Sequence, residues 1–169
     1  MKGRILYKEV QYFRNTWIYY LIIGIAVLSL AGGFIPIIIH GGSPESIVGI
    51  FRVLLVISGL LVLFGFSKLE TTIDEKTIYY RFPPFVNREQ SLGKSDISEI
   101  FVRKYRPVWE YGGWGYRIRP GKGRAINVSG NIGLQIVKNN GKALLIGTKK
   151  SEELKRAIKR LKANWEVDG

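Results

Sequence analysis

Residues 16–39 read TWIYYLIIGIAVLSLAGGFIPIII and contain no charged side chain. A helix rises about 1.5 Å per residue, so this stretch reaches about 36 Å and exceeds the roughly 30 Å of a bilayer's hydrocarbon core. A cleaved signal peptide would have a shorter apolar region, followed by a small-residue cleavage site. The pattern therefore predicts a transmembrane helix over residues 16–39.

A second apolar run, IVGIFRVLLVISGLLVLFGF, occupies residues 47–66, and only HGGSPES, residues 40–46, separates the two runs. So short a connection predicts an antiparallel helical hairpin. Arg52 is the one charged side chain in the second run. It lies near the outer end of the helix, from which its guanidinium can extend to the membrane surface. The alternative is an ion pair or a substrate contact inside an assembly.

The distribution of basic residues predicts the orientation of this hairpin. The loop over residues 40–46 has no Lys or Arg, whereas basic residues precede the first span and Lys68 follows the second. By the positive-inside tendency, both termini are cytoplasmic and the loop is external, in the cell (inner) membrane. The basic residues before the first span are Lys2, Arg4, Lys8 and Arg14.

Residues 1–15 form a cytoplasmic basic flank in this scheme. Leu6, Val10, Phe13 and Trp17 recur at helical spacing, which favours a short interfacial helix on the inner leaflet. An ordinary basic flank is the alternative.

Residues 68–165 have a different pattern, with short β-type runs between turn signals. Asn140-Gly141 between two apolar runs is the strongest hairpin signal among them. We count seven or eight strands whose connections are too short for parallel crossovers, which predicts one antiparallel sheet. Residues 151–165 follow as an amphipathic helix that closes the sheet. Its apolar stripe is Leu154, Ile158, Leu161 and Trp165.

Three segments carry a family resemblance: YGGWGYR at Tyr111–Arg117, INVSGNIGLQIVKNNGKALLIGTKK at Ile126–Lys150, and the helix after them. They resemble the bacterial pleckstrin-homology-like (PH-like) domains of small two-span membrane proteins, many of which have no assigned activity. The resemblance implies an α+β PH-like domain after the membrane helical hairpin. Eukaryotic relatives bind phosphoinositides with basic residues around the first hairpin. The turn Asp74-Glu75-Lys76, taken as that hairpin, is mostly acidic and does not carry this site over.

The glycines and aromatics of residues 110–124 lack the spacing of a phosphate-binding P-loop. Three interpretations of Tyr111, Trp114 and Tyr116 stay open. The rings pack along the sheet and cover backbone exposed at the glycines, or they line a ligand or peptide groove, or they stack on nucleic acid. No RNA-binding signature accompanies them, so we expect no nucleic-acid partner.

Residues 68–169 hold 21 Lys and Arg against 11 Asp and Glu, a net charge of +10. A basic domain tethered to an anionic leaflet is attracted to it, and solvated surface charge is the alternative. The candidate contacts to anionic lipid are Lys122, Arg124, Lys155, Arg156 and Lys159.

The chain has no cysteine and one histidine, His40. This composition excludes thiolate and multi-histidine metal sites, and the acidic residues show no catalytic pairing. We therefore expect no catalytic, cofactor or metal site. The sequence favours a non-enzymatic membrane-anchored module whose partners are membrane lipid and either a protein or further copies of the chain. The alternatives are a subunit of an oligomeric transport or channel complex, and a peripheral lipid-binding role.

Overall fold

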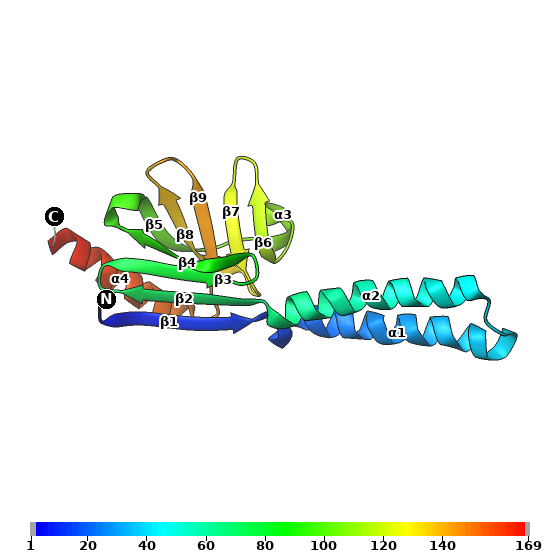
Figure 1. Cartoon of the computed structure of the whole chain (residues 1–169). Helices are drawn as coiled ribbons and strands as arrows, with labels where there is room; N and C mark the ends of the chain where they lie inside the picture. The colour runs from blue at the N-terminus through cyan, green and yellow to red at the C-terminus, as the bar shows by residue number, and fades with distance from the viewer. Residues whose placement is uncertain (1–2, 168–169) are drawn as a thin grey trace. The chain divides into compact units, whose positions relative to one another are not determined.

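The computed structural model describes residues 3–167, and it divides into two compact units (Figure 1). One unit is residues 12–67. The other combines the residues before 12 with those after 67, and we call it the β-domain. The helical hairpin is thus an insertion within the β-domain's sequence, between its first and second strands.

The unit of residues 12–67 contains η1 (Phe13–Asn15), α1 (Trp17–His40) and α2 (Pro44–Phe66). Both long helices are long and apolar enough to cross a membrane. Their side chains are mostly exposed, as expected for helices that face lipid. Gly33 lies against the side chain of Ile50, so α1 has a small residue where α2 comes close.

Helix α2 begins at Pro44, three residues before the predicted start at residue 47. Ser43 is the reason, because its hydroxyl accepts a hydrogen bond from the backbone N–H of Ser46 at 3.2 Å. Pro44 and Glu45 then suit the first turn. The connection between the helices is residues 41–43 rather than the predicted 40–46.

The prediction of an interfacial helix within residues 1–15 is wrong for the described residues. Ile5–Tyr12 form strand β1, and Lys2 lies outside the described residues. The buried face of β1 carries Tyr7, Glu9 and Gln11 at a spacing of two. Because two of these three side chains are polar, the strand period is invisible to a search for apolar residues.

The β-domain has two sheets, and the predicted single sheet of seven or eight strands is wrong. The first sheet has the order β1-β2-β3-β4, and the second has the order β5-β8-β9-β7-β6. Between them the chain turns at η2, where Asp96 accepts from the backbone N–H of Gly93 at 2.9 Å. The remaining elements are β2 (Lys68–Asp74), β3 (Thr77–Phe82), β4 (Val86–Gly93), η2 (Lys94–Asp96), β5 (Ile97–Lys104), α3 (Pro107–Tyr111), β6 (Gly115–Arg119), β7 (Gly123–Asn127), β8 (Ile132–Lys138), β9 (Ala143–Gly147) and α4 (Ser151–Val167).

One strand pair of the second sheet is parallel, contrary to the prediction of antiparallel pairing throughout. Strand β7 pairs with β9, with Arg124 opposite Leu144 and Ile126 opposite Ile146. Strands β8 and β9 form the hairpin predicted at Asn140-Gly141, and β9 then lies between β7 and β8. The argument from short connections failed because it considered only consecutive strands.

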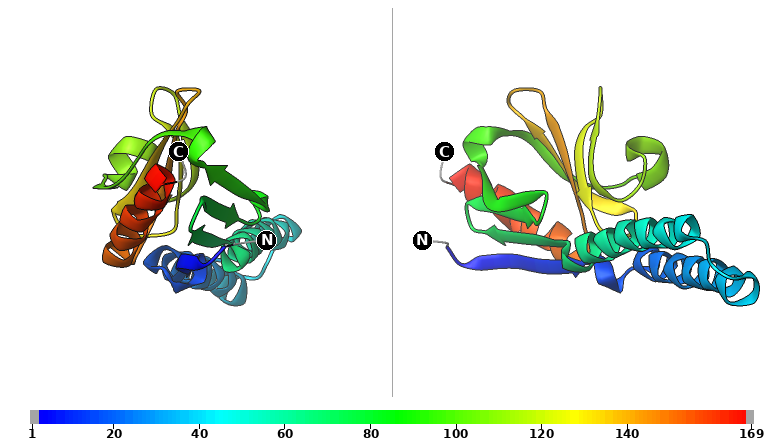
Figure 2. Two further views of the ribbon diagram at one scale, coloured as in Figure 1. Left: turned by 90° about the vertical axis from the view of Figure 1, so that its left-hand side faces the viewer. Right: turned by 45° about the vertical axis from the view of Figure 1, so that its right-hand side comes forward.

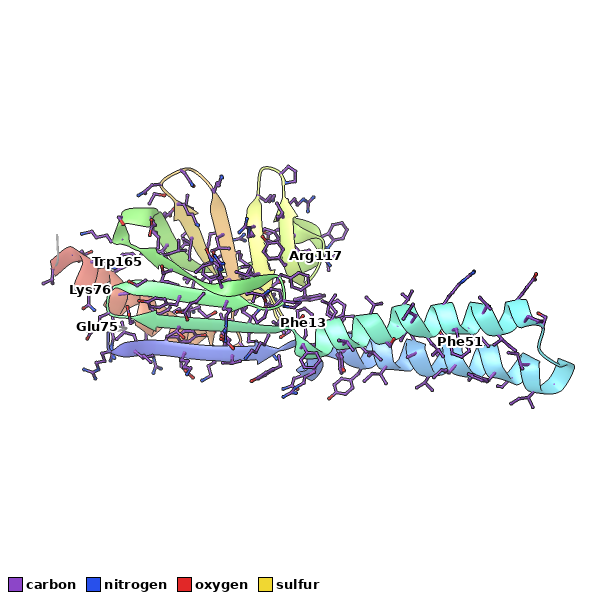
Figure 3. All side chains as sticks on the ribbon, in the orientation of Figure 1. Phe13, Phe51, Glu75, Lys76, Arg117 and Trp165 are labelled. Carbon is purple, nitrogen blue, oxygen red and sulfur yellow. The ribbon has the colours of Figure 1, made fainter. Side chains whose placement is uncertain are left out.

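Helix α4 buries the predicted stripe of Leu154, Ile158, Leu161 and Trp165. It contacts β2 of the first sheet and β5 and β8 of the second (Figure 2). The indole N–H of Trp165 donates to the backbone carbonyl of Lys76 at 2.8 Å (Figure 3). The helix therefore packs on both sheets instead of closing a single one.

Candidate functional site

The three aromatic residues of the YGGWGYR segment have different neighbours. Tyr111 ends α3 and is buried, with its ring edge-on to Tyr105 at 6.1 Å between centroids. The Trp114 indole donates to the carbonyl of Gly130 at 3.0 Å. Tyr116 stacks on Phe85 at 6.1 Å. Each of the three side chains thus has a different partner, and the groove predicted from them stays a prediction.

The glycines of the same segment reverse the chain between α3 and β6. Gly112, Gly113 and Gly115 have φ values of 75°, 117° and 111°, which favour glycine because it lacks a Cβ. The backbone N–H of Gly115 donates to the Asn127 side chain at 2.9 Å. These positions support the interpretation of the glycines as structural.

Helix α3 is an element that the sequence analysis missed. Pro107 occupies its first turn and Gly112 its left-handed C-cap, which are the signals that identify it. Its Glu110 forms an ion pair with Arg103 at 2.8 Å and accepts from the backbone N–H of Arg106 at 2.7 Å. Burial acts to raise the pKa of Glu110, but these partners outweigh it and hold the pKa below its usual value.

The outer side of α3 exposes two large apolar side chains, Val108 at 55 % and Trp109 at 79 %. We call this pair the α3 ridge. It borders a cavity of about 650 Å³ whose lining includes Lys104, Arg106 and Asn131. The ridge combines a large aromatic surface with neighbouring cationic and amide groups, which suits a protein contact.

A second cavity, of about 600 Å³, lies between the β6–β7 and β8–β9 turns. Two of the predicted lipid contacts, Lys122 and Arg124, line it. The sequence analysis did not identify the other three basic residues of its lining, two of which lie beside the first turn only through the parallel pairing of β7 with β9. Those residues are Arg119 on the near side and Lys138 and Lys142 on the far side. We call this cavity the two-turn pocket.

The other predicted lipid contacts, Lys155, Arg156 and Lys159, lie on α4 and are exposed. Lys155 forms an ion pair with Glu152 at 2.8 Å. Neither Lys155 nor Lys159 lines the two-turn pocket; both border a shallow cavity beside Ile100. The five predicted residues therefore belong to two different places on the β-domain.

A buried polar cluster joins β1 to the end of β9. The Glu9 carboxylate accepts hydrogen bonds from the Thr148 hydroxyl at 2.8 Å, from the Lys149 backbone N–H at 2.9 Å, and from the Tyr7 hydroxyl. Burial, reinforced by the hydrogen bond to Glu9, raises the pKa of Tyr7 far above its usual value. Gln11 adds a bond from its amide to the carbonyl of Gly147 at 2.8 Å. We call this cluster the β1 latch.

Arg52 lies on α2 with an exposed side chain, and no ion pair joins it to another residue of the described chain. Between residues 3 and 167, no group of three His, Cys, Asp or Glu side chains is placed to hold a metal ion. Comparison of the sequence with models of protein families and with curated proteins found no match.

Proposed function

We propose that this chain is a membrane-anchored, non-enzymatic interaction module of the PH-like type. It docks a protein partner at the inner face of the cell membrane through the α3 ridge. The observation that carries the proposal is the exposure of Trp109 at 79 % on a short, firmly held helix.

Tryptophan is the residue type that contributes most often to binding energy at protein interfaces. A large exposed apolar side chain gains nothing for the stability of the free domain. Trp109 also loses little freedom on binding, because its helix is already held by the ion pair of Glu110 with Arg103 and by the packing of Tyr111 against Tyr105. A rigid aromatic anchor of this kind lowers the entropic cost of association.

The anchoring half of the proposal rests on the inserted hairpin. Strands β1 and β2 are neighbours in one sheet, and the two candidate spans lie between them in sequence. Because both strands belong to one domain, the two ends of the hairpin lie on the same side of the bilayer. The basic residues flanking the spans favour the cytoplasmic side.

A photo-crosslinking amino acid placed at Trp109 of the full chain, in native membranes, tests the proposal. The matched control places it at Asn87, an exposed position on β4. We expect a discrete protein adduct from position 109 and none from position 87. Adducts with lipid alone, or the same protein adducts from both positions, would contradict docking through the α3 ridge.

The second candidate is a subunit of an oligomeric transport or channel complex, and the exposed charge of Arg52 favours it. Two spans cannot enclose a path, so this function requires several copies of the chain. The mass of the purified protein in detergent separates the candidates. An Arg52-dependent oligomer supports transport, whereas a monomer, or an oligomer that persists in Arg52→Gln, contradicts it.

A further inference from the structure

The parallel pair β7–β9 brings two hairpin turns together. Strand β7 starts at the end of the β6–β7 turn, and β9 starts at the end of the β8–β9 turn. Because β7 and β9 run in the same direction, both turns lie at one end of the second sheet (Figure 1). The two-turn pocket is the space that they enclose.

Glycine is required where the two turns meet. Gly123 has a φ of 84°, and a Cβ at this position would overlap with the backbone carbonyl of Ala143. The close approach of these two backbones fixes the spacing of the turns, and it therefore fixes the spacing of the side chains that they carry.

The charge of the two-turn pocket is entirely positive. Five basic side chains line it, and no carboxylate is among its described lining residues. Within residues 3–167 no ion pair neutralises any of the five. The five side chains are Arg119, Lys122, Arg124, Lys138 and Lys142.

Two of these cations are oriented by neutral groups. The Arg119 guanidinium donates to the backbone carbonyl of Trp109. The Arg124 guanidinium lies over the ring of Tyr116, at 5.3 Å from the ring centroid. Both arrangements position a guanidinium without neutralising its charge. Remaining N–H groups of each are available to an anion.

Five like charges around one cavity repel one another, so they add nothing to the stability of the free domain. A concave surface of a single sign concentrates counter-ions. Arginine and lysine together are the usual ligands of phosphate oxygens. The lining also includes the apolar Leu144 and Ala143 and the amide of Asn140, so an apolar group and a hydroxyl can be accommodated beside a phosphate.

We infer that the two-turn pocket binds a phosphate ester that carries at least two negative charges and a small organic remainder. Its volume falls in the range of about 300–1,000 Å³ that is common for small-molecule sites. This inference goes beyond the proposed function, because it uses different residues from the α3 ridge. The ester is either the head group of an anionic lipid or a free phosphorylated compound.

Hydrogen exchange of the full chain in phosphatidylcholine nanodiscs separates these sources. One arm adds phosphatidic acid to the bilayer, and the other adds free glycerol 3-phosphate. Protection of backbone amides in residues 121–124 and 139–142 in the first arm alone identifies a lipid head group. Protection in the second arm identifies a free phosphate ester. Absence of protection at both turns in both arms, at low salt, would overturn the inference.

Two triple variants with equal charge changes show whether the pocket itself is responsible. Lys122→Gln, Arg124→Gln and Lys142→Gln together should raise the half-maximal ligand concentration by about tenfold or more, because charge-assisted contacts are lost. Lys155→Gln, Arg156→Gln and Lys159→Gln together should raise it by less than about twofold. Equal losses in both variants would mean general electrostatic attraction and would overturn a defined pocket.

Discussion

The hydroxyl of Thr148 donates a 2.8 Å hydrogen bond to the carboxylate of Glu9, although 139 residues separate them in sequence. Both side chains are buried. Glu9 precedes the two candidate spans and Thr148 follows them, so the β1 latch joins the two parts of the β-domain's sequence. A strand connected directly to η1 and α1 is thereby held within the β-domain.

Replacing Glu9 should be strongly destabilising. Glu9→Ala leaves the Thr148 hydroxyl, the Lys149 backbone N–H and the Tyr7 hydroxyl without their acceptor, and each unsatisfied buried group costs about 1–3 kcal/mol. We expect a loss of about 3 kcal/mol, measured by chemical unfolding of the full chain in detergent. Glu152→Ala, which breaks an exposed ion pair, should leave the free energy of unfolding nearly unchanged. Equal losses would show that the β1 latch contributes nothing.

Protonation of the Asp74 carboxylate in acid should lower the free energy of unfolding. Burial acts to raise the pKa of Asp74, but backbone hydrogen bonds from Lys76 at 3.0 Å, Thr77 at 2.7 Å and Gly3 at 3.0 Å outweigh it and lower the pKa. The unfolded state then binds a proton more readily than the folded state. The contribution of Asp74 is therefore present above the unfolded pKa of about 3.9 and is lost as pH falls through the folded value.

Unfolding of Asp74→Asn as a function of pH tests this. The variant should be less stable than the parent near neutral pH, and the difference should shrink between about pH 5 and pH 2. A difference that stays constant over this range would contradict the role of the ionised carboxylate.

Gly123 and Gly121 provide a matched pair in the β6–β7 turn. Both have positive φ, at 84° and 73°, but only Gly123 has a neighbouring backbone where a Cβ would lie. Gly121→Ala should cost about 1 kcal/mol, from backbone strain alone. Gly123→Ala should cost clearly more and should weaken binding in the two-turn pocket. Equal thermal unfolding midpoints for the two variants would contradict the close approach of β7 and β9.

Leu161 and Lys159 provide the corresponding test for α4. Leu161 is fully buried, and Leu161→Ala should cost about 2–5 kcal/mol because it removes core contacts and leaves a cavity. Lys159→Ala, on the exposed face, should change the free energy of unfolding by less than about 0.5 kcal/mol. Comparable losses would mean that the stripe does not pack on the sheets.

The sequence predicts those features whose signal is apolar and local. Both long helices, the hairpin at Asn140-Gly141 and the buried stripe of α4 follow from runs and periods of apolar residues. Strand β1 escaped prediction because Glu9 and Gln11 lie on its buried face. Their burial is tolerated through partners near Gly147 and Thr148, and a local pattern cannot reveal such distant partners.

Local sequence signals likewise reveal only part of the α3 ridge and of the two-turn pocket. The Pro107 and Gly112 signals of α3 were present in the sequence, but a helix of five residues has no period to detect. Lys122 and Arg124 were identified by their Gly-rich turn. Lys138 and Lys142 joined them only through the pairing of β7 with β9, and a pairing between non-consecutive strands has no local sequence signal.

The proposed function depends on the β-domain lying at the cytoplasmic face, and cysteine labelling of intact cells tests this most directly. The chain has no native cysteine, so a thiol reagent can label each variant only at the introduced cysteine. Glu45→Cys is exposed in the first turn of α2 and leaves the Ser43 cap intact, and Ser95→Cys is exposed in η2. We predict that an impermeant thiol reagent labels position 45 in intact cells and labels position 95 only after the cells are opened. Labelling of position 95 in intact cells, with position 45 protected, would contradict the account.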